Sequence, residues 1–515
     1  MLGEREAQRR LFSAGTQLGA AVVAKLGFYG KLATEGHRIF QDGDFAGAYC
    51  EDNGRPSVPP SLLALARLLQ HHDGVSDEET VARCRYDLRW KVALDLDLAS
   101  VEAPFAKSTF QAFRARLTVH LKEGLAFEKS VQVAKEAGLL PKRLRLALDS
   151  SPVRGRGAVK DTFNLLSDAI VAVVRAVARR RGRRAEPLAR EAGLARHLES
   201  PSIKGSELVD WGDSGAVSAF LGGLIEDGGR AVALAEQAGC ATEEVALLRK
   251  VIAQDVEPDP RGGVRIREGV APERTVSVHD PEMRHGHKSN GKVYSGHKMS
   301  LAVEITSGVI TSVDVTAPAE ADGAQVRSLL ERTEELTGCP VDYALGDTAY
   351  STRTALAQAK EAIVALFTKM PSPPKGRYGP SAFRVSRGGK RAVCPAGHRS
   401  LRLVRRAEGQ LHQWAVPTCG SCPLKSACTR AAARSLLVPP DFHERRARER
   451  YANSERGRGR LRQRVVAEHG IGRLKNRGAG AARYCGRAKT RAQLLWTAAV
   501  ANLSLAWARD ADLAA

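Results

Sequence analysis

Between residues 143 and 367, segments with the periodicity of strands alternate with segments with the periodicity of helices. Arg143 to Asp149 alternates basic and apolar residues, as a strand with one covered face does. The later segments are, in chain order, a hairpin over 297–305 and 309–315, a helix over 324–336, a strand over 341–345, a helix over 353–360 and a strand over 362–367. This order predicts an α/β fold, with a mixed sheet that carries helices on its faces.

The segments that flank and interrupt this series have other patterns. Residues 56–122 predict three short helices, which suit a helix-turn-helix DNA-binding unit or, equally, a plain three-helix packing unit. Residues 165–250 are rich in Ala and Arg and predict further helices, whereas the Pro-, Gly- and Cys-rich residues 370–440 predict loops. We expect a long basic helix over 442–475 and a final apolar helix over 488–508.

The charge of the chain points to a polyanionic partner. Its 515 residues carry a formal net charge of +22, and nucleic acid is the commonest partner for such an excess. A membrane surface is the rival, but the most apolar late stretch, residues 494–507, is interrupted by polar residues and is too short to span a bilayer. The N-terminus lacks the apolar segment of a signal peptide. We therefore expect a cytoplasmic, nucleoid-associated protein that binds DNA and no membrane.

Two aspartates follow apolar strands and are candidates for holding metal ions. Asp149 closes the strand that begins at Arg143, and Asp347 closes the strand over 341–345. In open sheets, ligand-binding residues lie at the carboxyl ends of strands. Transfer of phosphodiesters uses two divalent ions about 4 Å apart, and Mg²⁺ prefers carboxylate oxygens. Each aspartate alone is a weak signal, because Asp after a strand is often a turn former or a helix N-cap.

A third carboxylate, Glu468, lies in the most basic part of the chain. Residues 441–491 contain sixteen Lys or Arg against five Asp or Glu. Arg464 precedes Glu468 by four residues and Lys475 follows it by seven, so one helix face would carry all three. A solvated, salt-bridged face has the same spacing and contributes little stability. An acid in so basic a segment instead favours a metal-binding carboxylate between two phosphate-binding cations.

Five residues between 394 and 428 have the chemistry of zinc ligands. The favoured set is Cys394, Cys419, Cys422 and Cys428, with His398 as a substitute. In a reducing compartment, clustered cysteines more often bind metal than form disulfides. Four protein ligands leave no open position, so the Zn²⁺ would be structural and would stabilise a segment with little core of its own. The alternative is a group of reduced thiols in a loop.

These motifs together resemble the DDE transposases of bacterial insertion sequences, in particular the group with a Cys-rich insert before the catalytic glutamate helix. That family carries Tyr, two residues, Arg, three residues, Glu, six residues and Lys; Arg464, Glu468 and Lys475 match it, with Leu461 in place of the Tyr. The similar segments are LALDSSPV, DPEMRHGHKSNGKVYSGHKMSLAVEITSGVIT, ALGDTAYST and RYCGRAKTRAQLLWTAAVANL. The likeness covers about residues 60–507.

The resemblance implies an RNase H-like catalytic domain in which Asp149, Asp347 and Glu468 bind Mg²⁺ or Mn²⁺. Arg464 and Lys475 would hold the DNA backbone near the cut. The implied activity is cleavage at the terminal inverted repeats of an insertion sequence, followed by strand transfer into target DNA. A homodimer or higher oligomer on DNA would carry it out.

These implications divide the chain into units. We expect an N-terminal helical DNA-binding domain over 1–125, a catalytic domain over 140–166, 286–370 and 440–510, a helical insertion over 167–285, and a Cys-rich zinc insertion over 371–439. Two other functions fit the sequence. One is a zinc-stabilised DNA-binding factor without chemistry, and the other is an RNase H-like nuclease that hydrolyses without joining.

Overall fold

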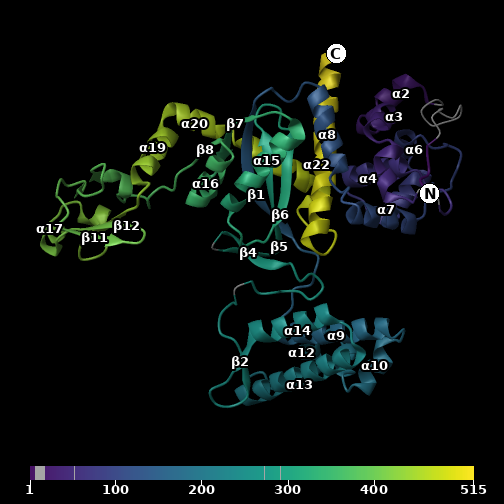
Figure 1. Cartoon of the computed structure of the whole chain (residues 1–515), viewed down its shortest axis with the longest axis horizontal. Helices are drawn as coiled ribbons and strands as arrows, with labels where there is room; N and C mark the ends of the chain where they lie inside the picture. Colours follow the sequence, from purple (N-terminus) through teal and green to yellow (C-terminus); the bar gives the residue numbers. More distant parts are fainter. Residues whose placement is uncertain (6–17, 51–52, 272, 290, 515) are drawn as a thin grey trace.

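A six-stranded mixed sheet forms the centre of the computed structural model, which describes residues 1–5, 18–50, 53–271, 273–289 and 291–514 (Figure 1). The strand order is β4-β5-β1-β7-β8, with β6 also paired to β5. β1 runs antiparallel to β5 and parallel to β7, and β7 runs parallel to β8. The strands are β1 (Leu144–Arg154), β4 (Arg284–Ser289), β5 (Lys292–Glu304), β6 (Ile310–Thr316), β7 (Val341–Gly346) and β8 (Ala365–Thr368). The predicted mixed α/β sheet is confirmed.

Helices cover both faces of this sheet, as predicted. Ala147 and Val153 of β1 pack on one face, whereas Leu144, Leu146 and Leu148 pack on the other, because side chains alternate along a strand. The first face is covered by α8 (Leu125–Glu136), α21 (Val465–Leu474) and α22 (Arg487–Ala514); the second is covered by α15 (Val326–Thr337) and α16 (Arg353–Glu361). Asp149 follows Leu148 and therefore shares the face of Ala147, on which α21 packs. Within the described residues, no helix has both the length and the apolar character needed to cross a membrane.

β1 is longer than its sequence predicts, so Asp149 lies inside the strand and does not close it. Pairing with β5 continues through Arg154↔Gly296, whereas pairing with β7 ends at Ala147↔Leu345. Pro152 lacks an N–H group, but beyond Ala147 one side of β1 has no strand beside it. A proline is tolerated there because no ladder hydrogen bond is lost.

The N-terminal helices pack around α4, which is buried along nearly its whole length. Their shared core includes Trp496, Val500 and Leu503, so this unit rests on the C-terminal helix α22 (Figure 1). The elements are α2 (Ala20–Ala24), α3 (Phe28–Ile39), the 3₁₀ helix η1 (Asp42–Ala48), α4 (Pro60–Asp73), α5 (Asp77–Tyr86), α6 (Leu88–Leu94) and α7 (Lys107–Val119). Four α-helices, α4 to α7, occupy the stretch in which the sequence pattern predicts three.

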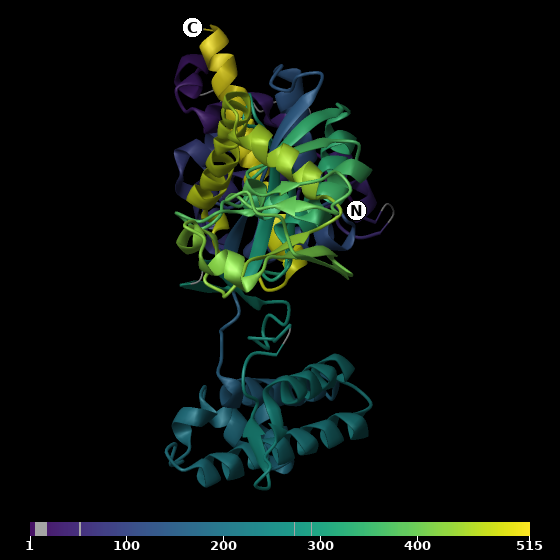
Figure 2. The same cartoon turned by 90° about the vertical axis from the view of Figure 1, so that its left-hand side faces the viewer.

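Between β1 and β4 the chain forms a helical insertion with a core of its own (Figure 2). Two chain segments connect it to the sheet, and it lies below the sheet in both ribbon views. Its elements are α9 (Thr162–Arg180), α10 (Ala185–Glu191), α11 (Arg196–Glu199), α12 (Ile203–Ser206), α13 (Ser214–Ala238), α14 (Thr242–Asp255), β2 (Val256–Pro258) and β3 (Val264–Ile266). The helices predicted for residues 165–250 are confirmed.

Residues 370–440 contain more regular structure than the predicted loops. A three-stranded sheet packs with Phe383, Trp414 and Leu436 in a small core. So few apolar residues leave no periodic pattern in the sequence, which explains the difference. The elements are η4 (Pro380–Ala382), β9 (Arg384–Val385), β10 (Ala392–Val393), β11 (Arg402–Arg406), β12 (Gly409–Gln413), α17 (Val416–Gly420), α18 (Lys425–Cys428) and β13 (Ser435–Val438).

The single long helix predicted over 442–475 is wrong. The chain forms α19 (Phe442–Asn453), α20 (Glu455–Arg462) and α21, and then a π-helical turn, η5 (Lys475–Ala479). Ser454 has an extended backbone and caps α20 by accepting a hydrogen bond from the Gly457 amide, an arrangement that starts a new helix. At Gly457 a side-chain Cβ would lie 1.8 Å from the carbonyl oxygen of Tyr451, so the bend requires glycine.

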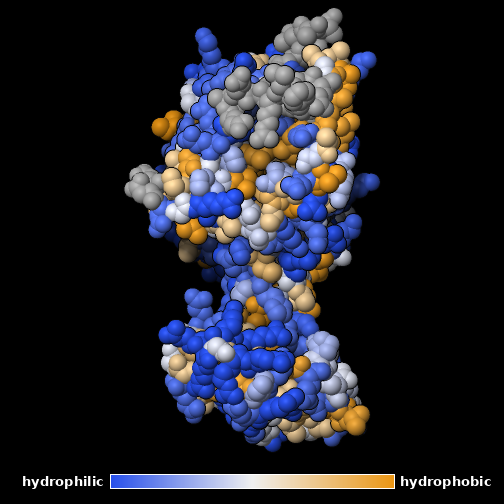
Figure 3. Space-filling view, turned by 90° about the vertical axis from the view of Figure 1, so that its right-hand side faces the viewer, coloured by the Kyte–Doolittle hydropathy of each residue, from blue (hydrophilic) through white to orange (hydrophobic). Residues whose placement is uncertain are grey.

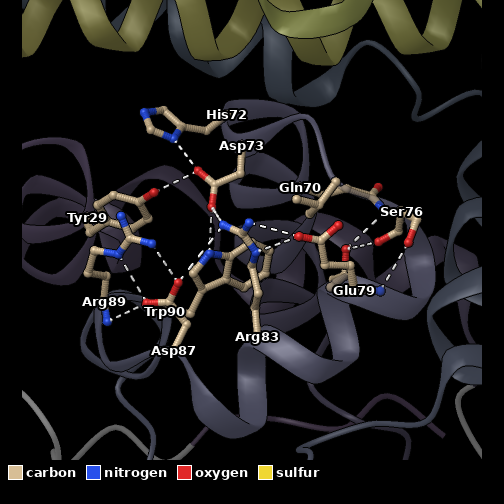
Figure 4. A network of polar contacts seen from close by, with 12 residues as sticks. Tyr29, Gln70, His72, Asp73, Ser76, Glu79, Arg83, Asp87, Arg89 and Trp90 are labelled. Carbon is tan, nitrogen blue, oxygen red and sulfur yellow. Dashed lines mark hydrogen bonds and ion pairs between the residues drawn. The ribbon is translucent and has the colours of Figure 1, made fainter.

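A buried polar network joins α3, α4, α5 and α6 (Figure 4). Asp73, whose side chain is 5% exposed, accepts hydrogen bonds from the Tyr29 hydroxyl at 2.7 Å, the Trp90 indole at 2.8 Å and the Arg83 guanidinium at 2.5 Å. Burial works to raise the pKa of Asp73, but hydrogen bonds from His72, Tyr29 and Trp90 outweigh it and lower the pKa to about 2. The ionised carboxylate therefore stabilises the packing of these helices.

We expect Asp73→Asn to lower the free energy of unfolding by about 2–3 kcal/mol, because it leaves Arg83 without its buried partner. Urea unfolding followed by circular dichroism measures this. The contribution is present above about pH 4 and is lost as pH falls towards 2, since the folded-state pKa is lowered. Glu78→Gln is the control: its side chain is 83% exposed and pairs with the exposed Lys107. Equal unfolding midpoints for the two variants would show that the network does not stabilise the fold.

Candidate active site

Asp149 in β1 and Asp347, which directly follows β7, occupy matching positions relative to two neighbouring parallel strands. Ala147 of β1 pairs with Leu345 of β7, and each aspartate lies two residues beyond its member of that pair. Neighbouring strands lie about 4.8 Å apart, and residues two apart point to the same face. The two carboxylates therefore stand side by side at the point where β1 and β7 part.

Arg464 connects Glu468 to these aspartates. Arg464 is the N-cap residue of α21, and its guanidinium donates to Asp149 Oδ2 at 3.3 Å and to Glu468 Oε1 at 2.6 Å. Glu468 lies in the first turn of α21 and is exposed. We expected Arg464 to face a phosphate, but in this structure it bridges two carboxylates. One cation thus holds β1 and α21 together at the site.

The electrostatics of Asp149 reflect the other two acids. Burial and, to a smaller extent, the negative charges of Asp347 and Glu468 raise the pKa of Asp149, the Ser150 amide and Arg464 oppose the rise, and the net value is about 6. An acid whose charge is this costly favours a cation beside it. Perturbed carboxyl groups of this kind concentrate at functional sites.

Asp347 also has a local structural role. Its Oδ1 accepts a hydrogen bond from the Ala349 amide at 2.8 Å and caps the 3₁₀ helix η3 (Thr348–Ser351). This turn buries Tyr350 completely. Burial raises the pKa of Tyr350 well above its usual range, and the charges of Asp322, Asp149 and Asp347 add to the rise. The sequence analysis did not identify Tyr350 as a neighbour of the two aspartates, although Tyr350 follows Asp347 by only three residues.

Arg460 fixes α20 against the edge of the sheet. Its guanidinium lies 4.6 Å from the ring centre of Tyr343 in β7 and 4.5 Å from that of Phe367 in β8. The Tyr343 hydroxyl also donates to Gln463, 3.3 Å away. Cation–π contacts of this kind contribute about 0.5–2 kcal/mol. They hold the segment that leads directly into Arg464 and Glu468.

The remaining signature positions lie on either side of this segment. Lys475 follows the end of α21, about 10 Å along the helix axis from Glu468, and is partly buried. Leu461, which stands where the family has Tyr, belongs to α20. The break at residues 463–464 separates it from the helix of Glu468. The departure from the motif therefore lies outside α21.

Two aspartates and a glutamate fit the ligand chemistry of Mg²⁺ or Mn²⁺. Nevertheless, no three His, Cys, Asp or Glu side chains in the described part of the chain are gathered closely enough to hold an ion. The Arg464 guanidinium forms ion pairs with both Asp149 and Glu468. That Asp149, Asp347 and Glu468 together hold a metal ion therefore stays a prediction, whereas the contacts of Arg464 with Asp149 and Glu468 are a feature of the structure.

Four cysteines line one small cavity and have the chemistry of Zn²⁺ ligands, although they too are not gathered closely enough to hold an ion. Cys394, Cys419, Cys422 and Cys428 border about 20 Å³ of this cavity. Burial raises the pKa of Cys428; Arg434 opposes this rise, whereas the charges of the other three cysteines add to it. His398 also borders the cavity but is an exposed residue. The arrangement therefore favours the four-cysteine set.

Comparison with protein families agrees with this geometry. A family model described as "Transposase domain (DUF772)" matches residues 35–116, and two described as "Transposase DDE domain" match residues 271–374 and 393–506. No curated protein and no solved structure matches the chain. The strand order and the helices on both faces define an RNase H-like α/β protein. The chain belongs to the DDE transposases of insertion sequences, a family that acts on DNA.

The charge coupling predicts how Asp149 titrates in variants. We expect Asp347→Asn to lower the pKa of Asp149 from about 6, and Arg464→Gln to raise it, because these changes remove a nearby negative and a nearby positive charge. Carbon NMR of protein labelled at the aspartate carboxyls measures both shifts. Arg462→Gln is the control, since Arg462 is exposed on α20. An Asp149 titration that Asp347→Asn leaves unchanged would place the two aspartates too far apart to form one site.

The same raised pKa has a consequence for stability. Asp149 ionises more readily in the unfolded chain than in the folded one, so the protein loses stability as pH rises from about 4 through about 6.

Proposed function

We propose that this transposase cuts DNA at the ends of its element and joins those ends to target DNA, with Asp149, Asp347 and Glu468 as its catalytic acids. The observation that supports this most is the matched register of the two aspartates, with Glu468 linked to them through Arg464. A protein that only binds DNA has no need of three converging acids in its most basic region.

Two Mg²⁺ or Mn²⁺ ions, when bound, would activate water or a 3′-hydroxyl group and stabilise the leaving oxygen. Asp149 lies in β1 and Asp347 directly follows β7, so the central sheet would hold both ligands in place. Glu468 completes the set from α21, whose position depends on Arg460. Arg464 and Lys475 carry positive charge on either side of Glu468, where they position phosphates without reading base sequence.

We further propose a division of labour along the chain. The N-terminal helices (1–125) bind DNA, and the catalytic unit, predicted over 140–166, 286–370 and 440–510, performs the chemistry. α8 also covers its sheet, and α9 begins at Thr162 within the core of the insertion, so we extend this unit to α8 and end its first part before Thr162. The helical insertion (167–285) and the Cys-rich insertion (371–439) interrupt the catalytic unit at two loops. Transposition requires two DNA ends to be held together, so we infer that a homodimer or higher oligomer is the active form.

In the Cys-rich insertion we propose one structural Zn²⁺, bound by Cys394, Cys419, Cys422 and Cys428. Four thiolates around one ion form a closed tetrahedral site without catalytic potential. The surrounding core contains few apolar residues, so an ion would supply much of the stability of this segment.

We expect Glu468→Gln to abolish cleavage and to leave DNA affinity within about twofold, because it removes one metal ligand and adds no bulk. The assay uses duplex DNA from the ends of the element with Mg²⁺ or Mn²⁺, and separates cleaved from joined products on a gel. Glu455→Gln on α20 is the matched control. Cleavage by Glu468→Gln at the rate of the control would remove Glu468 from the site. Cleavage without any joined product would identify a nuclease instead.

We expect about one zinc per chain in freshly purified protein, lost in Cys419→Ser/Cys422→Ser, because two of the four ligands are removed. Mass spectrometry of the metal content measures the stoichiometry. Cys240→Ser/Cys339→Ser is the control, since both cysteines lie far along the chain from the cluster. Wild-type protein without zinc would contradict this assignment.

A further inference from the structure

The helical insertion contains a groove of about 810 Å³ whose rim is rich in cations. Arg175 and Arg179 project from α9, Arg183 lies in the turn before α10, and Lys160 comes from the chain segment that enters the insertion. His279, from the segment that returns to the sheet, also lines the groove. The groove therefore starts at the connection to the catalytic sheet and extends along α9.

The arginines of the insertion are concentrated at this one end. Over residues 162–255, thirteen Asp or Glu slightly exceed twelve Lys or Arg, so the insertion as a whole is not basic. Seven of those twelve are arginines between Arg175 and Arg190, where Glu186 is the single acid. All seven are exposed. A general solubility surface has no reason to separate charge in this way, whereas a surface that binds a polyanion does.

Three of these seven arginines form ion pairs: Arg179 with Glu244 at 3.7 Å, Arg183 with Glu191 at 2.5 Å and Arg184 with Glu186 at 3.6 Å. All three arginines are exposed, so these pairs are weak. Within the described part of the chain, Arg175, Arg180 and Arg181 form no ion pair within 4 Å. Asp168, Glu199 and Glu244 also line the groove, and burial raises the pKa of Asp168. The balance around the groove remains positive.

The wall of the groove is held rigidly. His197 is buried and lies between the Ser167 hydroxyl at 2.9 Å and Asp227 Oδ2 at 2.8 Å. Asp227 in turn pairs with Arg196 at 2.5 Å and with Arg230. A surface that is fixed before binding loses little entropy when a ligand orders against it. Figure 3 views the molecule from the side on which α10 lies in Figure 1, and the insertion there presents mainly hydrophilic residue types.

Further cations lie along the chain between this groove and the end of β1. Arg154 ends β1 five residues after Asp149, about 17 Å along the strand. Arg156 and Lys160 follow in the segment that enters the insertion, and Arg154 and Arg156 are exposed. Positive charge therefore runs from the end of β1, through the connection, to Arg175, although Arg154 lies on the face of β1 opposite to Asp149.

We propose that the groove on α9 and the α9–α10 turn binds the phosphodiester backbone of the same DNA duplex whose end lies at Asp149, Asp347 and Glu468. The inference rests on the proposed function, because it requires a DNA end at the carboxylates. The insertion thus acts as a second clamp on that duplex, which contacts phosphates and reads no base sequence.

The test compares two triple variants of the full-length protein by fluorescence anisotropy with a labelled duplex from the element's end, without divalent metal. Arg175→Ala/Arg179→Ala/Arg183→Ala removes three groove cations. Arg249→Ala/Arg261→Ala/Arg267→Ala removes three exposed arginines of α14 and the β2–β3 region. At about 0.1 M salt, we expect the groove variant to bind on the order of tenfold more weakly than wild type. The salt slope, which is the slope of the logarithm of the binding constant against the logarithm of the salt concentration, should be smaller in magnitude by about 2–3. The control variant should match wild type.

Replacing the same three groove arginines by lysine keeps the charge and should preserve most of the affinity and the salt slope. Thermal unfolding followed by circular dichroism checks that each variant is folded. Equal affinity and equal salt slope for the groove and control variants would overturn the proposal. Equal weakening of both would also overturn it, because net charge would then be the cause. Absence of cleavage by wild type with Mg²⁺ is a separate result, which would contradict the proposed function. The comparison of DNA affinities would still test whether the groove binds DNA, because it does not depend on cleavage.

Discussion

The parallel pairing of β1 with β7 is the constraint on which the candidate site depends. That pairing stops at Ala147 and Leu345, so the next residues on the same face, Asp149 and Asp347, stand at the opening between the strands. Antiparallel pairing with β5 keeps β1 straight through Arg154. Because α8, α21 and α22 cover one face of the sheet and α15 and α16 the other, neither strand can shift register without exposing a core.

This rigid sheet permits an electrostatically costly arrangement. Three acids share one site, burial and mutual repulsion raise the pKa of Asp149 to about 6, and Arg464 partly compensates. The segment that carries Arg464 and Glu468 is strongly basic, with sixteen Lys or Arg against five Asp or Glu over residues 441–491. The stability lost there is recovered in the cores on both sides of the sheet.

The two insertions leave the sheet undisturbed because each enters at a loop and carries its own core. The helical insertion leaves after β1 and returns before β4, and the Cys-rich segment follows β8. Each adds a surface that the sheet lacks: an arginine-lined groove in one and a cluster of four cysteines in the other. Extra functions can therefore be added to this fold without repacking its centre.

Local pattern was sufficient for β1, β5, β6, β7 and β8 and for most helices of the sheet, because periodicity is a property of neighbouring residues, whereas β4 and the strands of both insertions were not predicted. Residues 143–149 and 341–345 indicated where Asp149 and Asp347 would lie, and spacing placed Arg464, Glu468 and Lys475 together. Tertiary structure alone decided the rest. The extension of β1 past Pro152 depends on a missing neighbour strand, and the bend at Ser454 depends on the close approach of Gly457 to Tyr451. Arg464 binding carboxylates, Arg460 lying over Tyr343 and the arginine groove all join residues distant in the chain, and no local pattern encodes such contacts.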